Sequence, residues 1–198
     1  EKMPLLEIII TPTTDPSVAA TAHRWAKRIG KTPVIVNDAP GFYVNRILGP
    51  YMNEAALLLE EGVSMTEVDT AMVKWGFPVG PITLFDEVGL DVAAKSGMIL
   101  QEAFGDRIPG NALVQKLVDD GRRGRKNGRG FYRYEGRKRA GPDPSVAPLA
   151  GFAAERSLPA EEIQERLVLG MLNEAVRCLE DGVLRSARDG DVGAVMGI

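Results

Sequence analysis

NEAALLLEEGV at residues 53–63 returns as NEAVRCLEDGV at residues 173–183, an ungapped match of seven residues in eleven at an offset of 120. Both copies place apolar residues at helical spacing and then reach a glycine, which is typical of an amphipathic helix and its C-terminal stop. Farther on the likeness weakens, although VDTAMVKWG and GDVGAVMG align if the second copy takes a short insertion before Asp191. The pattern predicts duplicated helical hairpins that pack with pseudo-symmetry. The alternative is two amphipathic helices that match by composition only.

Upstream of the first copy, the sequence predicts a strand, a helix and a second strand. Residues 4–10, PLLEIII, and residues 32–37, TPVIVN, are short apolar runs rich in β-branched side chains. Between them Asp15 offers an N-cap, Pro16 a first helical residue and Gly30 a stop. Strands joined in this way are parallel, and two strands alone do not make a stable sheet. We therefore interpret this unit as the end of a larger sheet that begins before residue 1.

The rest of the chain is predicted to be helical. A Pro-Gly turn with one or two helices is expected in FPVGPITLFDEVGLDVAAKSGMILQEAFG, residues 77–105. Residues 136–156 have the composition of a linker, with prolines and glycines around Asp143. Further helices are expected from Pro40 to Gly62, from the Ser64 and Glu67 capping box to Gly76, over residues 111–120, and from Ser157 and Pro159 onward.

Composition excludes some classes of protein. The net charge of -3 gives no reason to expect a polyanionic partner for the chain as a whole. One cysteine, Cys178, excludes a disulfide framework and a CxxC metal site. No apolar run approaches the roughly 18 residues that span a bilayer, and no signal peptide is recognisable. These features are typical of a soluble, intracellular protein.

Glu7 and Asn45 are candidate site residues. Glu7 lies within an apolar strand, where a carboxylate is costly unless it has a partner, so it either orients a catalytic imidazole or points into water at the strand end. The one histidine, His23, is expected at a helix surface, so a histidine that Glu7 serves has to precede residue 1. Asn45 follows DAPGFYV at a helix start, where unpaired N–H groups favour a substrate carbonyl or hydroxyl. An exposed polar side chain is the alternative.

The loop at residues 122–139 holds nine basic residues against one acid, Glu135, with Phe131, Tyr132 and Tyr134 interleaved. This composition suits nucleic acid or a phosphorylated cofactor. Because the chain as a whole is acidic, a local phosphate-binding loop or a solvated loop is favoured over nucleic acid. No G-x-G-x-x-G follows a strand, so the chain has no dinucleotide fingerprint.

Together EKMPLLEII, GKTPVIVNDAPGFYVNRIL, FPVGPITLFDEVGLD, GRKNGRGFY and LNEAVRCLEDGV resemble the 3-hydroxyacyl-CoA dehydrogenase family. The likeness is to the multifunctional members, which also contain an enoyl-CoA hydratase part and carry two helical domains in tandem. It implies a mainly α fold with helical domains of the 6-phosphogluconate dehydrogenase C-terminal type, after the last βαβ piece of a Rossmann domain. The implied domains are a Rossmann remnant at 1–38, a first helical domain at 39–135, a linker at 136–156 and a truncated second repeat at 157–198.

The resemblance also implies roles for residues. Glu7 matches the partner of a catalytic histidine that lies about a dozen residues upstream in the family, Asn45 matches a substrate contact, and Lys126 matches a lysine that reaches NAD. An acyl-CoA substrate, a thiolase subunit in the complete complex and a bacterial cytoplasmic location are implied as well, and no metal. Separately, the exposed edge of a two-strand sheet and the truncated second repeat predict exposed apolar surface, which favours self-association. Because the fingerprint and the histidine are absent, we predict that this chain alone is inactive. A non-catalytic CoA-ester-binding or dimerisation module and a nucleic-acid-binding protein are the other hypotheses.

Overall fold

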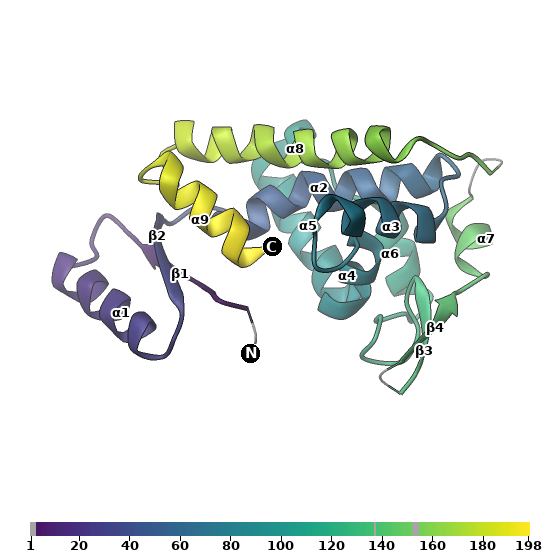
Figure 1. Cartoon of the computed structure of the whole chain (residues 1–198), viewed down its shortest axis with the longest axis horizontal. Helices are drawn as coiled ribbons and strands as arrows, with labels where there is room; N and C mark the ends of the chain where they lie inside the picture. Colours follow the sequence, from purple (N-terminus) through teal and green to yellow (C-terminus); the bar gives the residue numbers. More distant parts are fainter. Residues whose placement is uncertain (1–2, 137, 152–154) are drawn as a thin grey trace. The chain divides into compact units, whose positions relative to one another are not determined.

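The computed structural model describes residues 3–136, 138–151 and 155–198, and the chain divides into two compact units. Unit 1 comprises Glu1–Leu48 together with Leu172–Ile198, and unit 2 comprises Gly49–Met171. Helices α2 (Val44–Glu60) and α8 (Ala160–Glu180) each contribute to both units (Figure 1).

The fold is mainly helical, as the sequence predicts. Unit 1 also contains β1 (Leu5–Ile10), α1 (Pro16–Arg28), β2 (Thr32–Asn37) and α9 (Ala187–Gly197). Unit 2 also contains α3 (Met65–Trp75), α4 (Pro81–Val88), α5 (Leu90–Phe104), the 3-10 turn η1 (Gly105–Arg107), α6 (Ala112–Asp119), β3 (Tyr132–Glu135), β4 (Lys138–Pro142) and α7 (Val146–Ala150).

The predicted βαβ unit is confirmed in unit 1. Strands β1 and β2 pair in parallel, with Glu7 opposite Val34, and α1 packs against both strands (Figure 1). Asp15 caps α1 by accepting a hydrogen bond from the Ser17 N–H at 2.7 Å. Most of the apolar stripe of α1 is exposed, with Trp25 at 56%, because the sheet that it covers has only two strands among the described residues.

The second repeat packs on the same two strands. Helix α9 contacts both β1 and β2. The turn that precedes α9 pairs with the end of β2, since Asn37 donates from its backbone to Val183 and from its side chain to Gly182, at 2.9 and 2.7 Å. Residues far apart in the sequence thus fix the end of β2 and the loop that follows it.

The expectation that Pro40 begins a helix is wrong, because α2 begins at Val44. Gly41 and Phe42 have φ angles of 75° and 50°, in the left-handed region that a right-handed helix does not use. Phe42 is the one non-glycine residue in that region among those that the structure describes. Residues 40–43 therefore form a turn that aims the start of α2.

Helix caps in unit 2 follow the sequence closely. Ser64 accepts a hydrogen bond from the Glu67 N–H at 3.2 Å, and α3 ends at Gly76 as expected. The Glu67 carboxylate accepts from the Ser157 hydroxyl and the Leu158 N–H, at 2.7 and 3.1 Å. Glu67 therefore joins the start of α3 to the segment that leads into α8.

Residues 136–156 contain regular structure where the sequence predicts a linker. Strand β4 pairs antiparallel with β3 across a bulge, and α7 follows. The prolines and glycines of this segment shape a hairpin and a short helix, and Asp143 between them is fully buried. The domain boundaries derived from the sequence stay a prediction.

Within residues 3–136, 138–151 and 155–198, no helix has both the length and the hydropathy that a membrane span requires.

Candidate functional site

Glu7 bonds to the chain immediately before Asn45. Its carboxylate accepts hydrogen bonds from the backbone N–H groups of Tyr43 and Val44, at 3.0 and 3.4 Å. Burial raises the pKa of Glu7 above its ordinary value, and these two hydrogen bonds offset part of that effect. A carboxylate at a helix N-terminus is stabilised by unpaired N–H groups and by the helix dipole. Glu7 therefore serves as the anion that caps the start of α2.

Asn45 is exposed in the first turn of α2. The N–H groups of Tyr43 and Val44, which the sequence predicts to be unpaired, are directed to Glu7. A substrate oxygen bound at the start of α2 would thus form a hydrogen bond with the Asn45 side chain and not with the N–H groups of Tyr43 and Val44. The structure brings Glu7 and Asn45 to the same end of α2 in unit 1.

Arg46, the residue after Asn45, is a buried cation that the sequence did not reveal as a candidate. Its side chain is 2% exposed, and its Nε donates to the Glu174 carboxylate at 2.7 Å. The guanidinium also contacts the carboxylate of Asp181. Extending the repeat upstream could have found this cluster, because Arg46 and Arg166 also stand 120 residues apart.

Lys126 lies in unit 2, in the turn between α6 and β3. Its ammonium contacts the Asp91 carboxylate at 3.0 Å, and a hydrogen bond from Lys126 lowers the pKa of Asp91. The lysine crosses Gly89, where an added Cβ would lie 2.4 Å from Nζ. Because 44% of the Lys126 side chain is exposed, the cation stays available at the start of α5.

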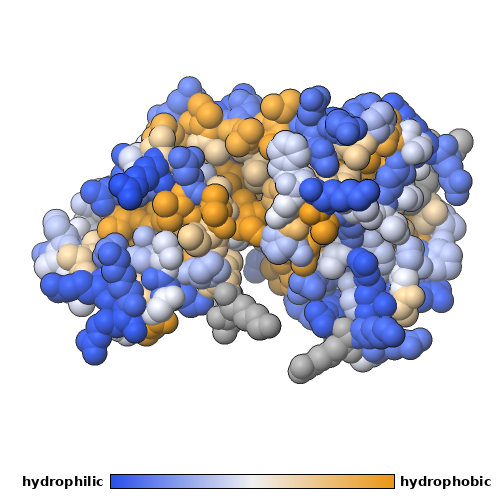
Figure 2. All heavy atoms as spheres, in the orientation of Figure 1, coloured by the Kyte–Doolittle hydropathy of each residue, from blue (hydrophilic) through white to orange (hydrophobic). Residues whose placement is uncertain are grey.

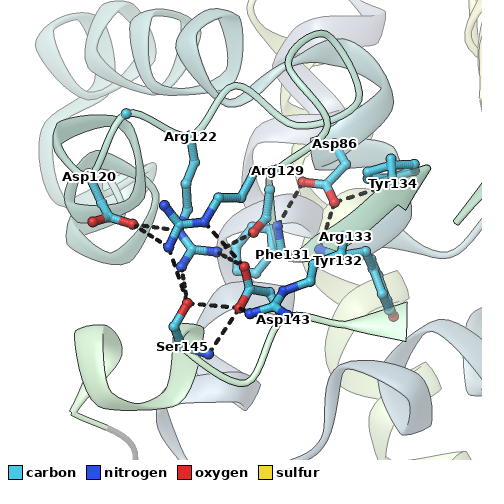
Figure 3. Close-up of polar contacts among 12 residues, drawn as sticks. Asp86, Asp120, Arg122, Arg129, Phe131, Tyr132, Arg133, Tyr134, Asp143 and Ser145 are labelled. Atoms are coloured by element: carbon cyan, nitrogen blue, oxygen red, sulfur yellow. Dashed lines mark hydrogen bonds and ion pairs between the residues drawn. The ribbon is translucent and has the colours of Figure 1, made fainter. Parts of the chain in front are cut away.

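Most of the described basic side chains in the loop at residues 122–139 form ion pairs with carboxylates from other parts of the chain. Figure 3 shows Arg122, Arg129 and Arg133 converging on Asp143, which also accepts from the N–H and hydroxyl of Ser145. Further ion pairs of the described residues in this stretch join Arg122 and Arg129 to Asp120, Arg123 and Lys126 to Asp91, Arg125 to Glu87, and Arg139 to Asp69. Most of the described cations of this loop are thus paired with carboxylates of the folded chain.

Two further buried aspartates organise unit 2. Asp86 accepts from the N–H groups of Phe131 and Tyr132, both at 2.9 Å (Figure 3). Asp69 accepts from the Ile82 N–H at 2.8 Å and from the Tyr132 hydroxyl at 2.8 Å. Asp69 and Asp86 thus accept hydrogen bonds from backbone N–H groups at the start of α4 and at the start of β3, which is a structural role.

Burial raises the pKa of Asp86 from 3.8 to about 6, although hydrogen bonds from Tyr132, Phe131 and Tyr134 oppose the change. The stability that this group contributes is complete below pH 3.8 and is lost as the pH rises through about 6. A tenfold change in proton affinity corresponds to about 1.4 kcal/mol, so the loss is on the order of 2–3 kcal/mol. We expect carboxyl-carbon NMR to show Asp86 titrating near pH 6. Titration at or below pH 4 would contradict this.

Comparison with protein families gives two adjacent matches. Residues 41–134 match the C-terminal domain of 3-hydroxyacyl-CoA dehydrogenase, and residues 1–39 match the NAD-binding domain of the same family. The chain is 53% identical over 200 residues to the fatty acid oxidation complex subunit alpha of Shewanella baltica. That match covers all of this chain and 28% of the relative, so the chain spans a little over a quarter of the relative's length.

Solved structures agree with these matches. The dehydrogenase part of multifunctional enzyme 1 from C. elegans superposes with a TM-score of 0.72 at 26% identity, over 98% of this chain and 45% of that one. The 3-hydroxybutyryl-CoA dehydrogenase from Escherichia coli superposes with a TM-score of 0.79 over all of this chain and 58% of that one. At 24% identity, that second likeness shows the fold alone. Two consecutive domain models of one family match this chain, and the alignment with the Shewanella baltica relative covers all of it. This chain therefore belongs to the 3-hydroxyacyl-CoA dehydrogenase family.

Proposed function

We propose that this chain supplies the substrate-side and dimerisation region of an NAD-dependent L-3-hydroxyacyl-CoA dehydrogenase of fatty-acid β-oxidation, in the cytoplasm of a bacterium. The observation that carries the proposal is the bonding of Glu7 to the two residues before Asn45. It joins the strand of the NAD-binding match to the start of the helical match in unit 1. Two residues to which the family resemblance assigns roles in catalysis and substrate binding, Glu7 and Asn45, thereby lie at the same end of α2.

The roles of the two residues follow from their surroundings. Glu7 is half-buried with its charge held by backbone amides, so it can orient an imidazole and stabilise the imidazolium that forms when a hydroxyl proton is removed. Asn45 is exposed beside it and can donate to, or accept from, the oxygen on the reacting carbon. We assign the proton transfer itself to a histidine of the complete protein, upstream of residue 1.

Lys126 fits the outer part of a dinucleotide site. Its exposed ammonium, fixed across Gly89 by Asp91, offers a cation to a phosphate or a ribose hydroxyl. When bound, NAD supplies the hydride acceptor for oxidation of the substrate. The described residues would hold NAD through Lys126, and the rest of the cofactor site belongs to the longer protein.

The test compares this chain with the longer protein that includes the complete NAD-binding domain. We expect the longer protein to reduce NAD with 3-hydroxybutyryl-CoA, and the 198-residue chain to give no NADH oxidation with acetoacetyl-CoA above a buffer blank. The reason is that the residue that transfers the proton lies outside the chain. An inactive longer protein would contradict the proposed reaction, and an active 198-residue chain would contradict the assignment of the histidine.

A second proposal, self-association, rests on the exposed apolar face of α8 in unit 1. Leu172, Val176 and Leu179 are 52%, 56% and 40% exposed at spacings of four and three residues, and Figure 2 shows apolar side chains gathered over α8 and α9. One helix face of this kind is typical of a protein interface. A thiolase subunit is the other partner that we propose for the complete complex.

Sedimentation velocity tests the self-association. We expect the chain to sediment as a dimer or larger species at about 50 μM, a concentration that suits an interface of micromolar affinity. Leu172→Glu with Val176→Glu should return it to a monomer, because each substitution places a charge in the apolar face. The matched control is Arg177→Glu, a charge change elsewhere on the same helix. A monomeric parent chain at this concentration would argue against the proposal.

A further inference from the structure

The internal repeat extends farther upstream than its most similar stretch. Residues 44–63 and 164–183 align at the same offset of 120, and the extension brings an arginine and two acids of each copy into register. The corresponding residues are Arg46 with Arg166, Glu54 with Glu174, and Glu61 with Asp181. Each arginine bonds to the two acids of the opposite copy.

In unit 2 this cluster is partly exposed. Arg166 contacts Glu54 and Glu61, each at 2.6 Å, and its side chain is 27% exposed. Solvent around the three side chains screens their attraction. This copy of the cluster is formed by residues of α8, of the C-terminal half of α2 and of the turn after α2.

In unit 1 the equivalent arginine and one of its two carboxylates are buried, and the arginine adjoins Asn45. Arg46 is 2% exposed and its partner Glu174 is 3% exposed, whereas Asp181 is 45% exposed. A buried arginine with two carboxylates has a fixed orientation, because any other placement would leave a charge unpaired in the interior. Since Arg46 follows Asn45 directly, the cluster fixes the helical turn from which the Asn45 side chain projects.

The residues just before Asn45 are held by the second repeat as well. The Tyr43 hydroxyl donates to the Gly190 carbonyl in α9 at 3.0 Å. An added Cβ at Gly193 would lie 2.8 Å from the Tyr43 ring, so α9 packs closely against it. With Glu7 on the N–H of Tyr43, the turn before Asn45 is bounded by β1 and by α9.

We propose that Arg46 is a positioning residue for substrate contact by Asn45, and that Glu174 and Asp181 of the second repeat hold it in place. The proposal rests on the proposed function, because it assigns a role in the same site. It gives the second repeat a part in substrate recognition, although Asn45 belongs to the first repeat. Arg46 itself acts through α2 and is not assigned any contact with substrate.

The test uses the longer protein and a pair of matched variants, Arg46→Lys and Arg166→Lys. Lysine keeps the charge but loses the planar fork that binds two carboxylates. A displacement of about 1 Å at a reacting group can reduce a rate by about 10²-fold. We therefore expect Arg46→Lys to lower kcat/KM for 3-hydroxybutyryl-CoA by about 10²-fold, with the KM for NAD unchanged within about twofold.

Arg166→Lys is the control, since it alters the equivalent cluster in unit 2 and should leave both kinetic parameters unchanged. Should Arg46→Lys fail to fold, the milder pair Glu174→Gln and Glu54→Gln gives the same comparison. The amide of the Glu174→Gln variant would keep an acceptor for the Arg46 Nε but lose the charge, and about a tenfold loss of kcat/KM is expected from that variant alone.

The outcomes separate the two proposals. If wild-type protein is active and Arg46→Lys lowers only the melting temperature, as Arg166→Lys does, the positioning role is overturned and the proposed function stands. Equal kinetic losses in both arginine variants would also overturn it, because the effect would then come from general stability. If wild-type protein is inactive with 3-hydroxybutyryl-CoA and NAD, the proposed function fails and this role fails with it.

Discussion

Asp143→Ala is expected to lower the free energy of unfolding by about 3–5 kcal/mol, because it leaves a buried arginine without its partner. The side chains of Arg122 and Asp143 are both 0% exposed and their charged atoms lie 3.1 Å apart. Asp143 also accepts from Arg129, Arg133 and Ser145. Burial acts to raise the pKa of Asp143, but the hydrogen bonds from Ser145 and Arg133 and the charge of Arg122 hold it well below the ordinary value. Urea unfolding followed by circular dichroism measures the loss.

The control for this prediction is Asp120→Ala, which removes a second carboxylate from the same arginine. The Asp120 side chain is 32% exposed and lies 2.9 Å from Arg122 Nε, so solvent can replace it at a cost of about 1 kcal/mol or less. A loss below about 1 kcal/mol for Asp143→Ala, or equal losses for both variants, would show that the buried cluster is not what holds the β3–β4 hairpin and α7.

Gly130→Ala is expected to destabilise the chain by about 3–5 kcal/mol through one added methyl group. An added Cβ at Gly130 would lie 1.9 Å from Oδ1 of Asp86. The carboxylate would have to move, and the N–H groups of Phe131 and Tyr132 would lose their acceptor in the interior. The free-energy costs of overpacking and of the unsatisfied buried N–H groups therefore add. Urea unfolding measures the total loss in the free energy of unfolding.

Gly97→Ala is the matched control for the glycine substitution. Gly97 lies within α5, and an added Cβ there would meet no atom within 4 Å. Alanine should stabilise that helix by about 0.5–1 kcal/mol, since it restricts the unfolded chain and favours helix. If Gly130→Ala unfolds at the same urea concentration as the parent chain, Asp86 is not confined as the structure indicates.

Local signals in the sequence predicted most of the secondary structure. Asp15, Ser64 and Gly76 mark helix ends that the structure places where they were expected. Caps and stops act through hydrogen bonds and backbone angles within a few residues, so they can be read without knowing the fold. The start of α2 was misplaced because the left-handed turn continues from Gly41 to Phe42, and a positive φ at a phenylalanine has no sequence signature.

The candidate site was predicted in part. The resemblance pointed to Glu7, Asn45 and Lys126, and the structure shows what Glu7 bonds to, where Asn45 lies on α2, and that Lys126 pairs with Asp91. Their catalytic roles remain proposals. Arg46 was missed because a single arginine in a helix has no local feature that tells a buried cation from a solvated one.

The sequence by itself determined that the chain is mainly helical, that it begins with a βαβ unit, and that its helical hairpin is repeated, because these properties follow from short-range periodicity and from the repeat. Only the tertiary structure decided which charges are buried. The sequence analysis placed Asp143 in a linker, whereas in the structure its buried carboxylate pairs with Arg122. Arg46 pairs with Glu174, which lies 128 residues farther along the chain. The physical reason is that the energy of a charge depends on the dielectric and on the counter-charges around it, and distant parts of the chain supply both.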